Sequence, residues 1–173
     1  MPICPKPALS LQALDPENDR LLVTALFEQL ADYVMLETGE APSPETIDEF
    51  FYDRPPSVEA VDKLLFVIRD GEGKPVGLID LLRNYPEPSD WYLGFLGIVL
   101  DKRGLGLGNA AVNLLKEMVH EASAKRLLLC VLEENPKALA FWQSEGFKFH
   151  RATPVWRSGR KTHHRSELIW RFG

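Results

Sequence analysis

The chain has 173 residues, of which 45% are hydrophobic and 26% are charged, and its formal net charge is −5. This composition is typical of a globular protein and excludes fibrous and low-complexity chains. No apolar run approaches the roughly 20 residues that a membrane-crossing helix needs, and the N-terminus lacks the apolar segment of a signal peptide. We therefore expect one cytoplasmic domain over residues 1–173, with residues 1–8 as a tail.

Charge is distributed unevenly along the chain. Residues 1–100 carry 18 acidic and 7 basic side chains, whereas residues 148–173 carry 7 basic side chains and one acidic. The acidic part favours a cationic small-molecule substrate. The basic end lacks interleaved aromatic residues, so we expect no nucleic-acid partner, and we expect no membrane partner. Cys130 is expected to be a buried free thiol, and no Cys/His spacing predicts a metal site.

The first half of the chain predicts two helices and a hairpin. Residues 9–14 predict a short strand, and residues 15–35 have the apolar spacing of one long amphipathic helix capped by Asp15. A second helix is expected over residues 43–53, with Ser43 as its cap. Residues 63–70 and 75–83 then predict two antiparallel strands joined by a Gly-rich turn.

The second half alternates strands and helices. The expected strands cover 91–100, 126–132, 147–156 and 164–172, and the expected helices cover 109–122 and 134–146. The histidine pair His163–His164 is expected on the surface of a basic hairpin. This order of elements predicts an α/β fold with a mixed sheet around a central βαβ unit.

The segment Arg103–Gly108 has the features of an anion site. Its glycines allow backbone N–H groups to approach a phosphate closely, and the N-terminus of the following helix favours negative charge. One alternative is a Gly-rich connection that binds no ligand. Another is a dinucleotide site, because residues 106–111 satisfy G-x-G-x-x-A and the acids 133–134 end the next strand. The antiparallel hairpin before the motif and the short sequence after it argue against that fold.

Two motifs together resemble a known family. The segment Arg103–Gly108 matches R/Q-x-x-G-x-G/A, and the segment Asn135–Phe147 resembles N-x-x-A-x-x-x-Y-x-x-x-G-F. At this spacing they are similar to the GNAT N-acetyltransferase superfamily. The resemblance implies a GNAT-like, mostly antiparallel seven-stranded sheet flanked by helices, with splayed central strands. It also implies acetyl-CoA as acyl donor and transfer of the acetyl group to a primary amine by direct attack.

The resemblance also implies where the cofactor binds. The glycine turn would hold the pyrophosphate, and the 91–100 strand would splay from the 126–132 strand at a bulge near Gly97. The backbone of Leu96 and Ile98 would pair with the pantetheine arm, and the N–H of Ile98 would stabilise the oxyanion. Phe141 is assigned mainly to the core and Trp142 to the wall of the site. The expected cofactor-binding residues are Leu96, Ile98, Arg103, Gly104, Leu105, Gly106, Gly108, Asn109, Asn135, Ala138, Phe141 and Trp142.

The sequence departs from the family pattern at Trp142, where a tyrosine commonly protonates the leaving thiolate. An indole N–H is not acidic enough for that role, so water or Tyr33 would supply the proton. The 91–100 strand also lacks a carboxylate base, and Asp80 is the foremost of several nearby candidates, unless it faces outward. The expected catalytic groups are Asp80, Tyr33 and the Ile98 N–H. The expected acceptor-binding residues are Asp32, Tyr33, Asp80 and Tyr92.

Three functional alternatives stay open. The donor could be another acyl-CoA or the acceptor an alcohol. The chain could be a catalytically degenerate acyl-CoA-binding sensor, which the tryptophan at position 142 motivates. The dinucleotide motif leaves an NAD(P)-binding protein as the third alternative. The sequence leaves the oligomeric state open between a monomer and a homodimer.

Overall fold

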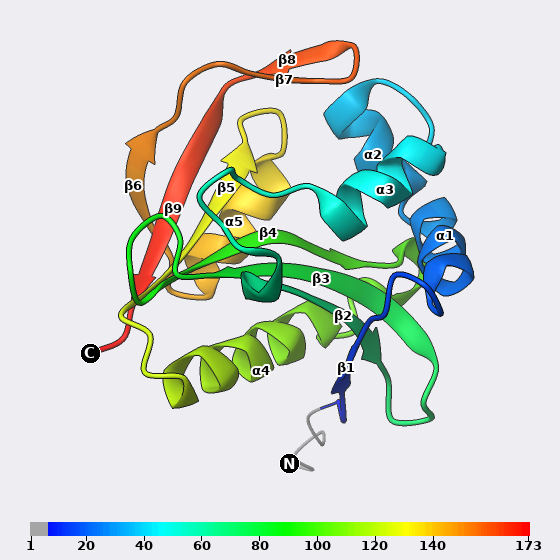
Figure 1. The fold of residues 1–173 in the computed structure, drawn as a ribbon, viewed down its shortest axis with the longest axis horizontal. Coiled ribbons are helices and arrows are strands. Elements are labelled where there is room, and N and C mark those ends of the chain that lie inside the picture. Colours follow the sequence, from blue (N-terminus) through cyan, green and yellow to red (C-terminus); the bar gives the residue numbers. More distant parts are fainter. Residues whose placement is uncertain (1–6) are drawn as a thin grey trace.

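A computed structural model describes residues 7–173 and shows a mixed sheet with helices on both faces (Figure 1). Except for Pro7 and Ala8, the expected tail lies outside the described residues, as does Cys4. The strands are β1 (Ser10–Ala13), β2 (Lys63–Arg69), β3 (Pro75–Arg83), β4 (Asp90–Ile98), β5 (Arg126–Leu132), β6 (Lys148–Ala152), β7 (Trp156–Ser158), β8 (Lys161–His163) and β9 (Arg165–Arg171). The α-helices are α1 (Arg20–Gln29), α2 (Ala31–Thr38), α3 (Pro44–Tyr52), α4 (Leu107–Glu121) and α5 (Pro136–Ser144).

The main sheet has seven strands in the order β1-β2-β3-β4-β5-β9-β6. Strands β4 and β5 are parallel, and every other neighbouring pair in this sheet is antiparallel. The parallel pair is joined through α4, as a βαβ connection requires. The predicted fold class is confirmed.

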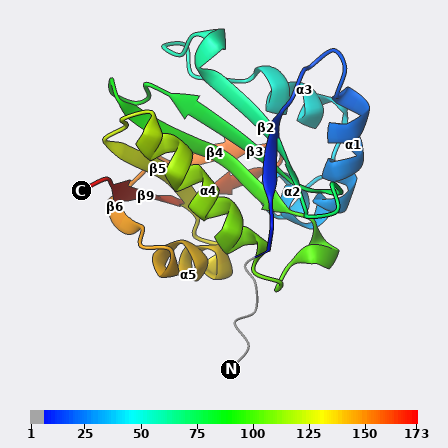
Figure 2. The same cartoon turned by 90° about the horizontal axis from the view of Figure 1, so that it is seen from below.

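Side chains of successive strand residues enter two different cores. On β3, Ile79 packs with Leu115 of α4 on one face, whereas its neighbour Leu78 belongs to the cluster with Leu26 of α1 and Phe50 of α3. This alternation follows from the pleat of a strand. Figure 2 shows α4 and α5 on one face and the three N-terminal helices on the other.

The single helix expected over 15–35 is wrong, because the structure divides it at Leu30. The side chain of Asp15 accepts hydrogen bonds within a turn, including one of 2.9 Å from the N–H of Glu17, and α1 begins only at Arg20. Leu30 leaves helical geometry (φ −105°, ψ 13°) and is fully buried in the core. Tertiary packing thus overrides a helical pattern that continues through this residue, and the break turns α2 toward the end of β4.

The strand expected over 147–156 ends at Ala152, and a separate hairpin of β7 and β8 follows. This hairpin packs against the C-terminus of α2, where the Thr38 carbonyl accepts a 2.9 Å hydrogen bond from the Arg160 N–H. The expectation that His163 lies on the surface is wrong. Its side chain is buried, and Nε2 lies 2.6 Å from the carbonyl oxygen of Glu37.

The docking of the hairpin predicts a specific intolerance at Gly159. This residue has φ +56°, and a Cβ there would lie 2.7 Å from the carbonyl oxygen of Thr38. We expect Gly159→Ala to destabilise the protein by about 2–4 kcal/mol, because overpacking adds to left-handed strain. Gly73→Ala is the matched control, since Gly73 has φ +79° and open space around it. Urea unfolding measures both variants, and equal destabilisation of the two would contradict the close contact.

Candidate functional site

The site begins where β4 separates from β5. Parallel pairing extends only from Asp90 to Leu93 of β4. There Gly94 forms a β-bulge, because β3 pairs Leu81 with Leu93 but Asp80 with Phe95. The bulge therefore lies at Gly94 and not near Gly97, as the sequence had suggested. A bulge bends the strand that contains it, so β4 leaves β5 at this point.

The separation leaves one edge of β4 facing a gap. The N–H of Val99 donates a 3.0 Å hydrogen bond to the Val76 carbonyl, and hydrogen bonding alternates along an antiparallel ladder. The backbone groups of Leu96 and Ile98 consequently face away from β3, toward the gap. The Ile98 carbonyl accepts a 2.8 Å hydrogen bond from Nε of Arg103.

The glycine turn leads directly into α4. Gly106 caps this helix with φ +79°, and no side chain caps the helix N-terminus. The first-turn N–H groups, beginning at Leu107, lack acceptors within the helix and carry its positive dipole end. Helix α4 begins at Leu107, two residues before the expected start, which places Gly108 within the first turn.

A cleft of about 1020 Å³ joins the gap to this turn. It is lined by β4 beyond the bulge, by the 103–109 turn and by the start of α5. All the expected cofactor-binding residues line it except Leu105, whose side chain is exposed. Trp142 lines the cleft as expected, although it is also buried in the core, and Phe141, which was assigned mainly to the core, is less buried and lines the cleft too.

Three polar residues of the cleft already have partners in the protein. The Arg103 guanidinium binds both carboxylate oxygens of Asp32, at 2.5 and 3.1 Å. Asn135 caps α5 by accepting a 3.2 Å hydrogen bond from the Ala138 N–H. Asn109 donates a 2.7 Å hydrogen bond to Glu145. In the turn, the groups that remain free to hydrogen-bond a ligand are therefore mainly backbone N–H groups.

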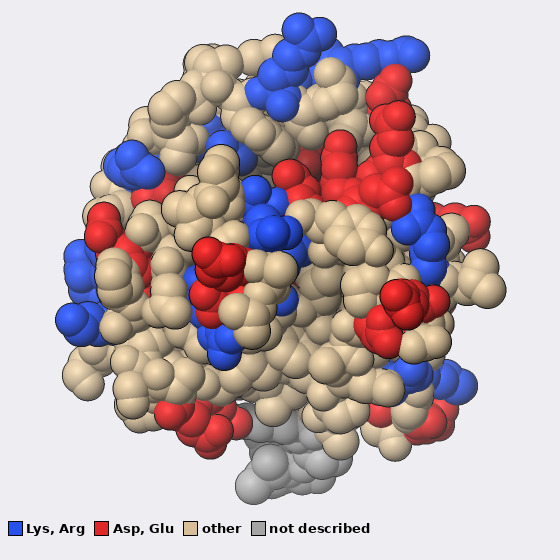
Figure 3. Space-filling view, viewed as in Figure 1, with Lys and Arg blue, Asp and Glu red and all other residues tan. Residues whose placement is uncertain are grey.

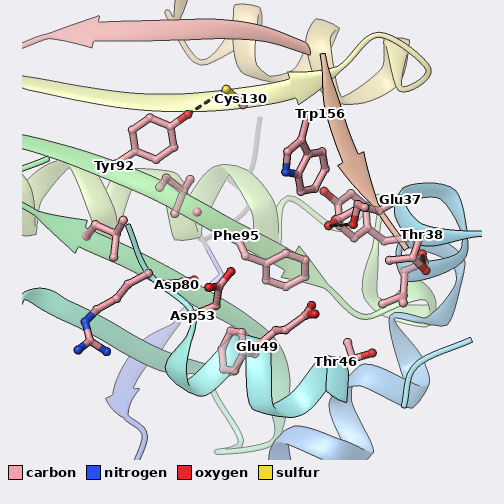
Figure 4. A pocket seen from close by; sticks show the side chains of 18 of the residues that line it. Glu37, Thr38, Thr46, Glu49, Asp53, Asp80, Tyr92, Phe95, Cys130 and Trp156 are labelled. Atoms are coloured by element: carbon pink, nitrogen blue, oxygen red, sulfur yellow. Dashed lines mark hydrogen bonds between the residues drawn. The ribbon is translucent and has the colours of Figure 1, made fainter. Parts of the chain in front are cut away.

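A second cavity, of about 570 Å³, lies between the sheet and the helices α2 and α3 (Figure 4). The sheet forms its floor with Asp80, Tyr92 and Cys130, while α2, α3 and the β7–β8 hairpin form its walls. We call this cavity the acidic pocket, for the carboxylates described next. The pocket and the cleft share the residues Tyr33, Leu93, Gly94, Phe95, Cys130 and Leu132. The two spaces therefore meet at the bulge.

Four carboxylates line the acidic pocket: Glu37, Glu49, Asp53 and Asp80. Figure 3 shows acidic side chains gathered on this face of the molecule, over α2 and α3. Burial raises the pKa of Glu37, Glu49 and Asp80, and the charge of Asp53 raises the pKa of Glu49 and Asp80 further. A concentration of partly buried negative charge attracts cations.

Asp80 is an interior carboxylate of the sheet, because β3 lies between β2 and β4. Its Oδ2 accepts a 2.8 Å hydrogen bond from the buried ammonium group of Lys63. Its Oδ1 is buried and has no hydrogen-bond partner among the described residues. A Cβ at Gly94 would lie 3.1 Å from Oδ2, so the carboxylate lies directly against the bulge.

Tyr33 and Glu37 lie one helical turn apart on α2. Tyr33 lines both spaces, and burial raises the pKa of its hydroxyl. Glu37 was missed by the sequence reasoning, although its i, i+4 spacing from Tyr33 indicates a shared helix face. Tyr92 lines the pocket, and its hydroxyl oxygen lies 2.9 Å from the Cys130 sulfur. Asp32, expected to bind the acceptor, lines the cleft instead.

Comparison with known proteins assigns the family. The profile described as the acetyltransferase (GNAT) family matches residues 23–147. The chain belongs to the GNAT acetyltransferase family. A GNAT acetyltransferase is a transferase. The glycine motif had also suggested a doubly wound dinucleotide-binding fold, and the observed sheet does not have that topology.

Solved structures with the GNAT fold cover nearly the whole chain. An acetyltransferase from Thermus thermophilus is 27% identical with a TM-score of 0.75, covering 95% of this chain and 97% of that one. A spermidine N-acetyltransferase from Vibrio cholerae, in complex with CoA and spermine, is 18% identical with a TM-score of 0.72, covering 94% and 95% of the two chains. A search of curated proteins gave no match.

Residues 7–173 contain neither a grouped set of metal ligands nor a helix of membrane-spanning character. Within this range, no group of three or more His, Cys, Asp or Glu side chains is arranged to hold a metal ion. None of the helices described there has the length and apolarity that crossing a membrane requires.

The Lys63–Asp80 pair predicts a pH-dependent cost of removing the lysine. Burial raises the folded-state pKa of Asp80. Its contribution to stability is therefore fully present below the unfolded pKa and is lost as the pH rises through the folded one. Lys63→Met removes the attraction between the lysine ammonium group and the Asp80 carboxylate. This attraction opposes the rise in the pKa of Asp80. We expect the substitution to destabilise the protein by about 3–5 kcal/mol at pH 7, and by much less at about pH 4.

Urea unfolding at both pH values checks this prediction. Lys74→Met is the control, because Lys74 pairs with Glu72 in solvent, and it should change little at either pH. If Lys63→Met loses the same stability at both pH values, the ionised Asp80 carboxylate does not cause the loss, and the prediction is contradicted.

Proposed function

We propose that this protein transfers an acetyl group from acetyl-CoA to a primary amine of a small cationic acceptor by direct attack. The observation that carries the proposal is the meeting of two spaces at the β4 bulge. One is a cleft that ends at a helix N-terminus, and the other is a pocket lined by four carboxylates. A donor thioester and an acceptor amine can thereby approach each other from opposite faces of the sheet.

The donor would bind along the cleft. The first-turn N–H groups of α4 suit a pyrophosphate, because they are unpaired and carry the positive end of the helix dipole. The free edge of β4 at Leu96 and Ile98 suits the amide groups of a pantetheine arm, which would add to it like a strand. The spaces meet at residues 93–95, so the N–H of Leu96 lies nearer to a reacting carbonyl than the expected oxyanion donor, that of Ile98.

Asp80 is the base that the geometry supports best. An amine with a pKa near about 10 must lose a proton before it can attack, and a carboxylate whose pKa is raised accepts protons more readily at neutral pH. Asp80 lies against the bulge, and burial raises its pKa. Because Lys63 occupies Oδ2, the unpartnered Oδ1 would receive the proton once the acceptor or a bridging water reaches this buried oxygen.

Tyr33 lines both spaces, which supports a role in which its hydroxyl would turn from Glu37 and donate a hydrogen bond to the departing sulfur. A full proton transfer from Tyr33 is not required, because a thiol pKa near about 8.5 makes thiolate a tolerable leaving group. Burial raises the pKa of the Cys130 thiol, which disfavours an acyl-cysteine intermediate and supports direct attack.

A turnover assay tests the function. The protein is mixed with acetyl-CoA and a panel of amines and amino acids, and released thiol is measured. We expect turnover with at least one cationic amine-bearing acceptor. Since a tryptophan stands at position 142, the competing hypothesis is an acyl-CoA sensor. Binding of CoA without thiol release from any acceptor would support the sensor, and thiol release only with alcohols would contradict amine transfer.

Gly106→Val tests the phosphate site. A side chain there would project from the turn that faces the cleft, and its nearest neighbour in the free protein is 4.0 Å away. Wild-type protein should gain about 5–10 °C in Tm when CoA is present at about 100 times its Kd. We expect Gly106→Val to fold and to lose this shift. Gly73→Val shares the positive φ of Gly106 outside the cleft and should keep it. A normal CoA shift in Gly106→Val would refute the placement.

A further inference from the structure

Arg165 is a half-buried cation of the acidic pocket, and its side chain has no polar partner within residues 7–173. It lies on β9, opposite Leu132 in the register of β5. Its guanidinium stacks over the Trp156 ring, with Cζ 4.1 Å from the ring centroid. Its Nε is buried and has no hydrogen-bond partner among the described residues, and no described carboxylate forms an ion pair with Arg165 within 4.0 Å. Stacking on the Trp156 ring orients the planar guanidinium group but gives none of its N–H donors a hydrogen-bond acceptor.

Three other cations near the acidic pocket and its junction with the cleft are engaged within the protein, whereas Lys102 and Lys137 line only the cleft. Arg54, which also lines the acidic pocket, donates a 2.9 Å hydrogen bond from Nε to the Val58 carbonyl. Lys63 is paired with Asp80 beneath the pocket, and Arg103 is paired with Asp32 in the cleft. Arg165 differs from these three because its charge is directed into the pocket without a counter-ion in contact.

No described carboxylate is in contact with Arg165, although Glu37 lies near enough for the two charges to attract each other. Burial raises the pKa of Tyr33, Glu37, Tyr92 and Cys130, and the nearby positive charge of Arg165 opposes the rise in each case. Arg165 is therefore close to all four groups, yet none of them is bonded to it. A partly buried charge without a partner is unfavourable, so an anionic group of a ligand would gain by binding there. A planar guanidinium matches a carboxylate with two parallel hydrogen bonds.

We propose that Arg165 binds a carboxylate of the acceptor, so that the acceptor is an amino acid and not a simple amine. This inference rests on the proposed function. Leu132, which pairs with Arg165, lines both the pocket and the cleft, so a carboxylate held by Arg165 would lie close to the place where the donor and acceptor meet. That position suits an amine and a carboxylate carried on the same carbon. The pocket carboxylates of α2 and α3 would then face the remainder of a cationic side chain.

Substrate pairs that differ only by the carboxylate test the proposal. Lysine is compared with cadaverine, ornithine with putrescine, and arginine with agmatine, by kcat/KM for thiol release. We expect the wild-type protein to prefer at least one amino acid over its decarboxylated partner by about tenfold or more, because a site built to pair a charged group rejects an analogue that lacks it.

Variants locate the preference at Arg165. Arg165→Gln should raise KM for the preferred amino acid by about tenfold or more and leave KM for the decarboxylated amine within about twofold. Arg165→Lys keeps the positive charge but loses the planar guanidinium. Its KM for the preferred amino acid should lie between the values for wild-type protein and for Arg165→Gln. Arg157→Gln on β7 is the control, since this exposed arginine makes no ion pair within the described residues and should behave like wild type.

The possible outcomes separate the two proposals. Equal use of both members of every pair by wild-type protein would overturn the role of Arg165 while leaving amine acetylation intact. An equal loss of activity toward both members in folded Arg165→Gln would overturn it as well. If Arg165→Gln does not fold, the wild-type pairs and Arg165→Lys decide the matter. Absence of thiol release from every amine and amino acid, by contrast, would remove the proposed function and this inference together.

Discussion

The separation of β4 from β5 at Gly94 is the constraint on which the rest of the site depends. Up to Leu93 the two strands satisfy each other's backbone groups, and beyond the bulge β4 presents an edge that β5 no longer covers. Backbone N–H and C=O groups need partners, so an interior edge of this kind is a place for a ligand that itself carries amide groups. The turn from β4 into α4 then places a helix N-terminus at one end of the same opening. One bulge therefore creates both the binding edge and the passage between the two faces of the sheet.

The acidic pocket is assembled from segments far apart in the chain. The break at Leu30 directs α2 across the end of β4, and the β7–β8 hairpin holds the C-terminus of α2 through Thr38 and Glu37. The ion pair between Asp32 and Arg103 connects the other end of α2 to the glycine turn. A shift of that turn would therefore also move α2, which carries Tyr33 and Glu37. The glycine turn and the acidic pocket are in this way coupled through a single short helix, α2.

The sequence predicted what depends on local patterns. The glycine turn, the helix after Asn135 and the alternation of strands and helices all rest on neighbours in the chain. The resemblance of the two motifs to the family then implied the seven-stranded sheet. The features that it missed depend on tertiary contacts. The buried Leu30 interrupts a pattern that still looks helical, and the burial of His163 follows from docking onto α2. Glu37 and Arg165 were not predicted as site residues, because only the groups that surround them in the fold distinguish them from other charged residues. The bulge was placed near the wrong glycine, since Gly94 and Gly97 are equivalent in the sequence pattern.

The central claim is that the gap between β4 and β5 receives the pantetheine arm of CoA. A crystal structure of the protein with CoA tests this most directly. We expect hydrogen bonds between the pantetheine amides and the backbone of Leu96 and Ile98, the pyrophosphate at the first turn of α4, and the thiol beside Gly94, where the cleft meets the acidic pocket. CoA bound elsewhere, or bound with its thiol pointing away from the bulge, would contradict the account.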